Sequence, residues 1–334
     1  MVMAATMRGA ELFYLLIISA VVTVVPVARA ADIAGAKLQQ QIRAADSLGL
    51  PHSLTLPRAK RSPYHIIKDC VMVTSEEGQY FHKAADDEAA VCGVYLLTDP
   101  DRFVEVHFDY LDVPCQNGGL VSFVDGWELN RQFFPSPEDH PKPLNLRYRE
   151  FCGQRKVKQV MESSQNAALI QYRIPARAKG FSFTVRFPKN STPCNILLEG
   201  TADVYTLRNY GKHVNCSLTT LYPANVKVLS LSVGLTNSKR DMELETGTIH
   251  KCQKRGLPDY VQLGGAEGLD TSHLAVADSI CGLDSKPGST VETIFCGVTT
   301  IRLVSSGQFD NAVTVALRQA GEDDIMEASL ICGL

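Results

Sequence analysis

The chain has 334 residues, of which 45% are hydrophobic and 21% charged, and its formal net charge is −3 at pH 7. This mild acidic excess argues against nucleic acid as a partner, because a phosphate backbone is bound by clustered Lys and Arg side chains. The length and the hydrophobic fraction are sufficient for two domains of ordinary size, each with its own core.

The first thirty residues are typical of a secretory signal peptide. Arg8 supplies a weak basic start, residues 12–25 are mostly apolar, and Ala28 and Ala30 are the small residues before a cleavage site after residue 30. An uncleaved membrane anchor is the alternative, but the apolar run is shorter than the ~20 residues that span a bilayer. We therefore assign 1–30 as a signal peptide and expect a secreted, extracellular protein without a membrane partner.

Two basic motifs are candidate processing sites. The sequence RAKR at 58–61 has the spacing that furin-like convertases recognise, and the segment 31–61 has no strand pattern. Residues 31–61 are therefore either a propeptide or an uncut linker. Lys239-Arg240 lies in a charged stretch that is either a protease-sensitive site or an intact loop.

Ten cysteines indicate a disulfide framework, because an even number in a secreted chain predicts five bridges. Cys70 and Cys92 have the same separation as Cys194 and Cys216, and the two pairs are offset by 124 residues. This internal repeat suggests that consecutive cysteines pair. The expected bridges are Cys70–Cys92, Cys115–Cys152, Cys194–Cys216, Cys252–Cys281 and Cys296–Cys332.

The repeat divides the chain into an N-terminal domain at 62–190 and a C-terminal domain at 191–334. "FCG" at 151–153 is echoed by "ICG" at 280–282. A second echo joins "SSQN", which begins at Ser163, to "SSGQFDN", which begins at Ser305. We therefore expect two related domains.

Alternating hydrophobicity predicts strands throughout both domains. In "FVEVHFDY", the residues Val104, Val106, Phe108 and Tyr110 fall on one side, and similar runs are broken by Gly, Pro, Asn and Asp. Only the segments 144–152 and 271–281 could form short helices. The expected fold is all-β, with two tandem disulfide-linked β-sandwiches.

The stretch "CQNGGLVSFVDGWEL" at 115–129 contains the chain's single tryptophan. Gly118 and Gly119 permit a tight turn, and Leu120, Phe123 and Val124 are expected in the core. Asp125-Gly126 is a turn signal with an acid that looks exposed. We expect Trp127 to be half-buried by packing; a ligand anchor is the alternative.

No motif supports catalysis or a cofactor. The sequence contains neither HExxH nor GxSxG; His107 is expected to be solvated on the polar side of a strand, and His140 is expected in a loop. We therefore expect no enzyme activity and no cofactor. Asn190 in "NST" and Asn215 in "NCS" are candidate glycosylation sites, which agrees with secretion.

The order of "VEVHFDY", "FVDG", "FCG", "SSQN" and "GFSFTV" resembles a CUB domain, a disulfide-linked extracellular β-sandwich that usually binds other macromolecules. Many such domains hold calcium with an acid three residues after their third cysteine, and that position here is Gly118. Asp259 stands in a comparable strand of the second domain, but one carboxylate cannot supply the six to eight oxygens that calcium takes. We therefore expect no metal.

The cysteine framework, with "DPDRFVEVHF", "VDGWEL", "FPSPEDHP" and "YVQLGGAEGLD", is similar to that of the corticotropin-releasing-factor-binding protein family from about residue 64 to 334. The resemblance implies a secreted glycoprotein that sequesters a corticotropin-releasing-factor-like peptide hormone, or in an invertebrate a related diuretic-hormone-like peptide. It also implies five sequential disulfides. A generic CUB adhesion or complex-assembly module without a hormone ligand is the alternative.

The resemblance also implies two hormone-binding positions, and the chain departs from the family at both. Vertebrate members have an Arg four residues before the first cysteine and an Asp two residues after it. The matching residues here are Ile66 and Met72. The contacts, or the peptide preference, are therefore expected to differ.

Overall fold

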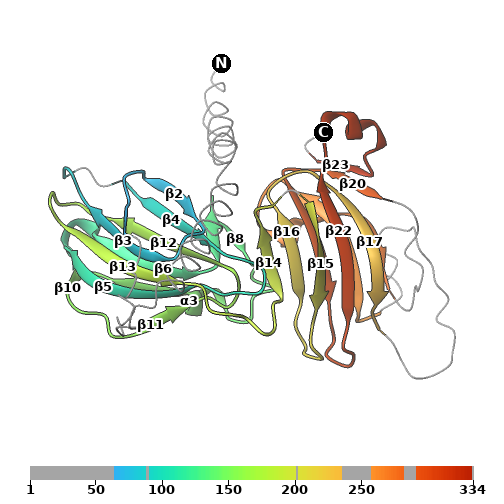
Figure 1. Ribbon diagram of the computed structural model, residues 1–334, viewed down its shortest axis with the longest axis horizontal. Helices are drawn as coiled ribbons and strands as arrows, with labels where there is room; N and C mark the ends of the chain where they lie inside the picture. The colour runs from blue at the N-terminus through green and yellow to red at the C-terminus, as the bar shows by residue number, and fades with distance from the viewer. Residues whose placement is uncertain (1–63, 88–89, 201, 235–256, 282–290, 333–334) are drawn as a thin grey trace, which may run out of the picture. The chain divides into compact units, whose positions relative to one another are not determined.

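The computed structural model describes residues 64–87, 90–200, 202–234, 257–281 and 291–332. These residues belong to one compact unit, Arg61–Leu334. They confirm the expected fold class, because they form two tandem CUB-like β-sandwiches (Figure 1). The expected signal peptide, RAKR at 58–61, Lys239-Arg240 and Cys252 lie outside the described residues.

The N-terminal sandwich pairs a six-stranded with a five-stranded sheet. The first sheet has the order β1 (Tyr64–Ile66), β3 (Gly78–Lys83), β13 (Gly180–Arg186), β5 (Glu105–Val113) and β10 (Gly153–Gln154), with β11 (Val160–Glu162) also on β5. The second has the order β2 (Val71–Thr74), β4 (Cys92–Leu97), β12 (Ala167–Arg173), β6 (Leu120–Asp125) and β9 (Tyr148–Phe151). A hairpin of β7 (Trp127–Leu129) and β8 (Gln132–Phe134), a 3₁₀ turn at η2 (Gln116–Gly118) and the helix α3 (Leu144–Arg147) complete this half.

The C-terminal sandwich has two five-stranded sheets. One has the order β14 (Asn195–Leu198), β16 (Cys216–Thr220), β21 (Val298–Val304), β18 (Tyr260–Ala266) and β19 (Ala275–Ile280). The other has the order β15 (Ala202–Arg208), β22 (Ala312–Gln319), β17 (Ala224–Ser232), β20 (Glu292–Phe295) and β23 (Leu330–Ile331). Two 3₁₀ helices, η3 (Thr271–His273) and η4 (Glu322–Glu327), lie between strands.

The two sandwiches share a strand topology. In each, an end strand runs parallel to its neighbour, β2 on β4 and β14 on β16, and the next three strands are antiparallel. "FCG" and "ICG" follow corresponding strands, β9 and β19. The serine echo is different, because Ser163 precedes β12 whereas Ser305 follows β21, the corresponding strand. That echo is therefore not part of the structural repeat.

Each sandwich has its own apolar core between its two sheets. Val104, Val106 and Phe108 are buried as expected, but Tyr110 is 45% exposed and Leu111 is buried. The pairing of β5 with β13 shifts between Ser182 and Phe183, and such a bulge moves all later side chains to the opposite face. The expectation that Tyr110 faces the core is therefore wrong.

A third apolar cluster contains residues from both sandwiches. Trp127, Phe134 and Leu169 of the N-terminal half are buried together with Leu197 and Leu269 of the C-terminal half. Burial of such side chains is worth about 1.5–3 kcal/mol each, so this cluster stabilises the contact between the halves.

The two segments with helical potential are mostly strand. Residues 144–147 form α3, but 148–151 form β9. In 271–281, one 3₁₀ turn at η3 precedes β19, where Val276 and Ile280 are buried by pairing with β18. None of the described helices is long and apolar enough to cross a membrane.

Candidate functional site

The structure separates the two positions expected to bind hormone. Ile66 ends β1, an end strand of its sheet, and its side chain is 55% exposed. Met72 lies in β2, an end strand of the other sheet, and packs against the N-terminal core. Because side chains alternate along a strand, Met72 faces inward while its neighbours Val71 and Val73 face out. Ile66 can therefore contact a ligand directly, whereas Met72 supports the strand from below.

Exposed apolar side chains occur on and beside these two end strands, and we call them together the apolar edge. The apolar edge consists of Tyr64, Ile66, Val71, Val73 and Val91, which are 45–62% exposed. Tyr64 and Ile66 lie on the outer face of one sheet, and Val71 and Val73 lie on the outer face of the other. Val71 and Val73 lie on the same face of β2, and clustered exposed apolar side chains often mark interaction sites. Sequence reasoning missed Val71 and Val73, because "VMVT" is apolar at successive positions and does not show which face is buried.

A disulfide holds the apolar edge in place. Cys70 precedes β2 and is bridged to Cys92, which begins β4, and Cys70 Sγ lies 3.5 Å from the backbone oxygen of Val91. The bridge links β2 to its neighbour beside the parallel pairing of Val71–Thr74 with 93–96. The exposed side chains of this region are therefore carried on a backbone with little freedom, which reduces the entropy lost on binding.

Three aromatic rings beneath the apolar edge, those of Tyr80, His82 and Tyr172, are uncharged at neutral pH. Burial, together with the negative charge of Asp69, raises the pKa of Tyr172 to about 12. Burial also raises the pKa of Tyr80 and lowers the pKa of His82, whose ring lies 4.6 Å from that of Tyr172. His65 stacks on Tyr80 at 4.6 Å. Beside the exposed apolar side chains, the segment between β1 and β2 carries the exposed charged residues Lys68 and Asp69.

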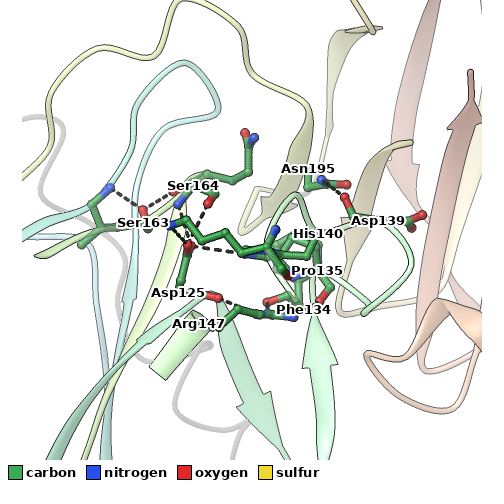
Figure 2. A network of polar contacts seen from close by, with 12 residues as sticks. Asp125, Phe134, Pro135, Asp139, His140, Arg147, Ser163, Ser164 and Asn195 are labelled. Carbon is green, nitrogen blue, oxygen red and sulfur yellow. Dashed lines mark hydrogen bonds and ion pairs between the residues drawn. The ribbon is translucent and has the colours of Figure 1, made fainter. Parts of the chain in front are cut away.

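Asp125 is a buried carboxylate of the N-terminal sandwich, so the expectation that it is exposed is wrong. It is 2% exposed at the end of β6 (Figure 2). Ser164 donates to it from its backbone nitrogen at 2.6 Å and its hydroxyl at 2.7 Å. Lys142 Nζ lies 2.6 Å from Oδ2, and His140 Nε2 lies 3.4 Å from Oδ1. Burial opposes ionisation, but these groups outweigh it and hold the pKa of Asp125 well below its usual range.

Gly126 and Arg147 complete the turn after Asp125. Arg147 is 1% exposed and donates to the backbone oxygens of Asp125, Phe134 and Pro135 at 2.8–3.0 Å. Gly126 has a φ of +102°, and a Cβ there would lie 2.1 Å from the Phe134 oxygen. Only glycine fits this conformation and this approach. The turn is therefore a buried scaffold rather than a surface loop.

The loop after β8 also contacts the second sandwich. Asp139, fully buried, receives Arg302 Nη2 at 2.6 Å and Nε at 2.9 Å. Its backbone oxygen accepts from Asn195 Nδ2 at 3.0 Å (Figure 2). His140 follows Asp139 and faces Asp125, so adjacent residues of one loop reach both halves. His140 is a loop residue, as predicted, and its side chain is buried.

Asp259 is surrounded by hydrogen-bond donors rather than by metal-binding oxygens. Ser306 donates to it from its backbone nitrogen at 2.9 Å and its hydroxyl at 2.7 Å, and Asn311 Nδ2 lies 2.6 Å from Oδ1. Calcium requires oxygen ligands, so this arrangement suits a carboxylate and not a cation. Gly118 has a φ of +73° and serves the turn at η2.

Four of the expected bridges are present: Cys70–Cys92, Cys115–Cys152, Cys194–Cys216 and Cys296–Cys332. Cys281 is also disulfide-bonded. Of the two candidate glycosylation sites, the Asn190 side chain donates to Gln165 at 3.3 Å, and that of Asn215 lies 3.5 Å from the Glu138 oxygen.

The stretch at 115–129 is largely scaffold. Phe123 and Val124 are buried, whereas Leu120 is only partly buried. Trp127 is 5% exposed, and its indole nitrogen donates to the Leu96 oxygen at 3.0 Å. It is therefore more deeply buried than expected and unavailable as a surface anchor.

The repeated sandwiches and their sequential bridges define a tandem CUB-like protein of the disulfide-linked kind. Two family models match the chain: the corticotropin-releasing factor binding protein N-terminal domain at 62–189 and its C-terminal domain at 196–326. The chain belongs to this family.

Relatives include the corticotropin-releasing factor-binding proteins of Homo sapiens, 32% identical over 78% of this chain and 78% of the relative, and Xenopus laevis, 32% identical over 75% of each. Among solved structures, the CUB1-EGF-CUB2 domains of rat MASP-1 are 11% identical over 74% of this chain and 99% of that chain, with a TM-score of 0.25. At that score the structural comparison carries no argument about function.

Proposed function

We propose that this protein is a secreted binding protein that sequesters a corticotropin-releasing-factor-like peptide and limits signalling through the peptide's receptor. The apolar edge is the observation that supports this proposal most directly. It exposes five large apolar side chains on and beside β1 and β2, the second of which is braced by the Cys70–Cys92 bridge, and the family resemblance expects the ligand there. The names of the relatives supply the class of ligand.

The chemistry of the apolar edge suits one face of an amphipathic peptide. Such peptides place apolar residues along one stripe and polar residues along the other, and they bind apolar surfaces with polar margins. An interface of ~800 Å² per partner can reach nanomolar affinity when a few anchors fit well. Ile66 replaces a charged residue of vertebrate relatives, so we propose that this chain binds its peptide through an apolar contact there.

Peptide binding is tested by titrating the purified mature protein with corticotropin-releasing-factor-like and diuretic-hormone-like peptides. Ile66→Ser removes apolar area from the proposed contact and is expected to weaken binding about tenfold, which corresponds to roughly 1.4 kcal/mol. Leu229→Ser is the matched control, because Leu229 is 44% exposed on β17 of the other sandwich. Excess wild-type protein should also reduce activation of the peptide's receptor. Equal losses in the two variants, or undiminished signalling, would contradict the proposal.

The remaining assignments complete the proposal. The signal peptide at 1–30, the propeptide or linker at 31–61, and domains at 62–190 and 191–334 follow the sequence patterns. Glycans at Asn190 and Asn215 are proposed for the secreted form. Intact-mass analysis of secreted protein before and after glycosidase treatment measures both the cleavage positions and the glycan occupancy.

A further inference from the structure

A cavity of about 680 Å³ lies directly beyond the end of β2. Its volume is within the ~300–1,000 Å³ of ordinary ligand pockets. Ser75 and Glu77, which follow β2, form part of its wall, and Leu197–Gly200 of the second sandwich form another part. The cavity therefore continues from the strand that carries Val71 and Val73.

The walls of the cavity combine negative charge with apolar surface. Four carboxylates line it, those of Glu77, Asp99, Glu199 and Asp203, against the single guanidinium of Arg102, which gives a formal charge of −3. Its apolar lining is supplied by Leu97, Pro100, Phe187, Leu197, Leu198 and Tyr205. A long side chain with an apolar stem and a cationic head matches both properties at once.

Three of the four carboxylates each accept one hydrogen bond and retain capacity for a further donor, while Asp99 pairs with Arg102 at 3.4 Å. Glu199 Oε2 accepts from Ser75 at 2.9 Å, and Glu77 Oε1 accepts from the Phe187 nitrogen at 2.6 Å. Asp203 Oδ1 accepts from the Val204 nitrogen at 2.7 Å. Each of these contacts engages one oxygen of a carboxylate, and an ionised carboxylate offers about four lone-pair sites.

We infer that this cavity binds an arginine or lysine side chain of the peptide whose apolar residues contact the apolar edge. The inference rests on the proposed function, because it assigns the cation to the same ligand. Val73 of the apolar edge and Glu77 of the cavity wall are four residues apart in the chain. A peptide segment of a few residues is therefore long enough to contact Val73 and to reach the cavity. The cavity selects for a basic residue at a fixed distance from the ligand's apolar face.

The test uses probes that do not depend on the identity of the hormone. Ligand-observed NMR titrations compare Nα-acetyl-arginine amide with Nα-acetyl-citrulline amide, which has nearly the same shape without the charge. The double variant Glu199→Gln, Asp203→Asn is expected to weaken arginine binding at least tenfold. The double variant Glu322→Gln, Asp323→Asn makes the same change in net charge on η4 and is expected to stay within twofold of wild type.

Equal binding of arginine and citrulline, or an equal response of the two double variants, would overturn the cation site. Displacement of arginine by millimolar calcium but by no basic peptide would also overturn it, in favour of a metal. Arginine binding without binding of any corticotropin-releasing-factor-like peptide would support the cavity and refute the proposed hormone. Hormone binding that is unchanged in the Glu199→Gln, Asp203→Asn variant would support the hormone and refute the cavity's part in it.

Discussion

Two buried aspartates, Asp125 and Asp259, permit a matched test of what a neighbouring cation contributes to a buried carboxylate. Each accepts a backbone N–H and a hydroxyl from one serine at 2.6–2.9 Å. Asp125 also has Lys142 Nζ at 2.6 Å, whereas Asp259 has the neutral amide of Asn311. Aspartate to asparagine preserves the shape and removes the charge, so the two substitutions isolate the effect of the cation.

The magnitudes follow from the hydrogen-bond geometry. In Asp259→Asn, Oδ1 keeps the donors from Ser306 and Asn311, and the new amide group donates to the Ser306 hydroxyl, so we expect a loss of about 1 kcal/mol or less. In Asp125→Asn, the amide group faces the Lys142 ammonium, and two donors repel. Loss of this charge-assisted bond, with the ammonium left against a donor, is expected to cost about 3 kcal/mol, while Oδ1 keeps its contacts with Ser164 and His140.

Guanidinium unfolding with the disulfides intact measures both losses. Trp127, the single tryptophan, is two residues from Asp125 and buried, so its fluorescence reports the N-terminal sandwich. Far-UV circular dichroism follows the β-structure of both halves together. The folded-state pKa of Asp125 lies below its ordinary value, so its contribution is complete above pH ~4 and is lost as the pH falls through the folded-state pKa. Equal losses for the two variants at pH 7 would refute the reasoning.

The remaining predictions concern a histidine and an interdomain ion pair. Burial lowers the folded-state pKa of His82, so the unfolded state takes up its proton first, and stability should decline as the pH falls below about 6.5. His82→Gln should flatten this decline, measured as the urea midpoint at pH 7.5 and 5.5, and an unchanged slope would contradict the assignment. Arg302→Met leaves the buried carboxylate of Asp139 without its cation and should cost about 3–5 kcal/mol in guanidinium unfolding. Arg208→Met breaks a half-exposed pair and should cost much less than Arg302→Met, so similar losses in the two variants would contradict this expected order.

The sequence was most informative where the physics is local. Alternation of apolar residues depends on a few neighbours, so it located β5, β13 and β17 and the all-β class. It could not locate the bulge that exposes Tyr110, because a bulge is a property of the pairing between β5 and β13. The same limit explains 271–281, where the partner strand decides between helix and strand.

Asp125 shows why the buried polar groups could not be predicted. Aspartate followed by glycine usually marks a surface turn, and the residues that bury this one come from 17 and 39 positions away, at Lys142 and Ser164. The two serine pairs of the sequence echo do not occupy equivalent positions in the structural repeat. Each pair nevertheless donates to a buried aspartate, Asp125 in one half and Asp259 in the other, at opposite ends of corresponding strands. The equal cysteine spacing, by contrast, reflected a true structural repeat.

The brevity of β1 and β2 has a consequence for how this protein behaves at high concentration. A foreign strand added beside either one could form hydrogen bonds along only three or four residues. Such a short ladder gives little affinity to unrelated extended chains, so amyloid-like stacking through this border is disfavoured. Discrimination among partners must then come from the shapes of their side chains rather than from their backbones.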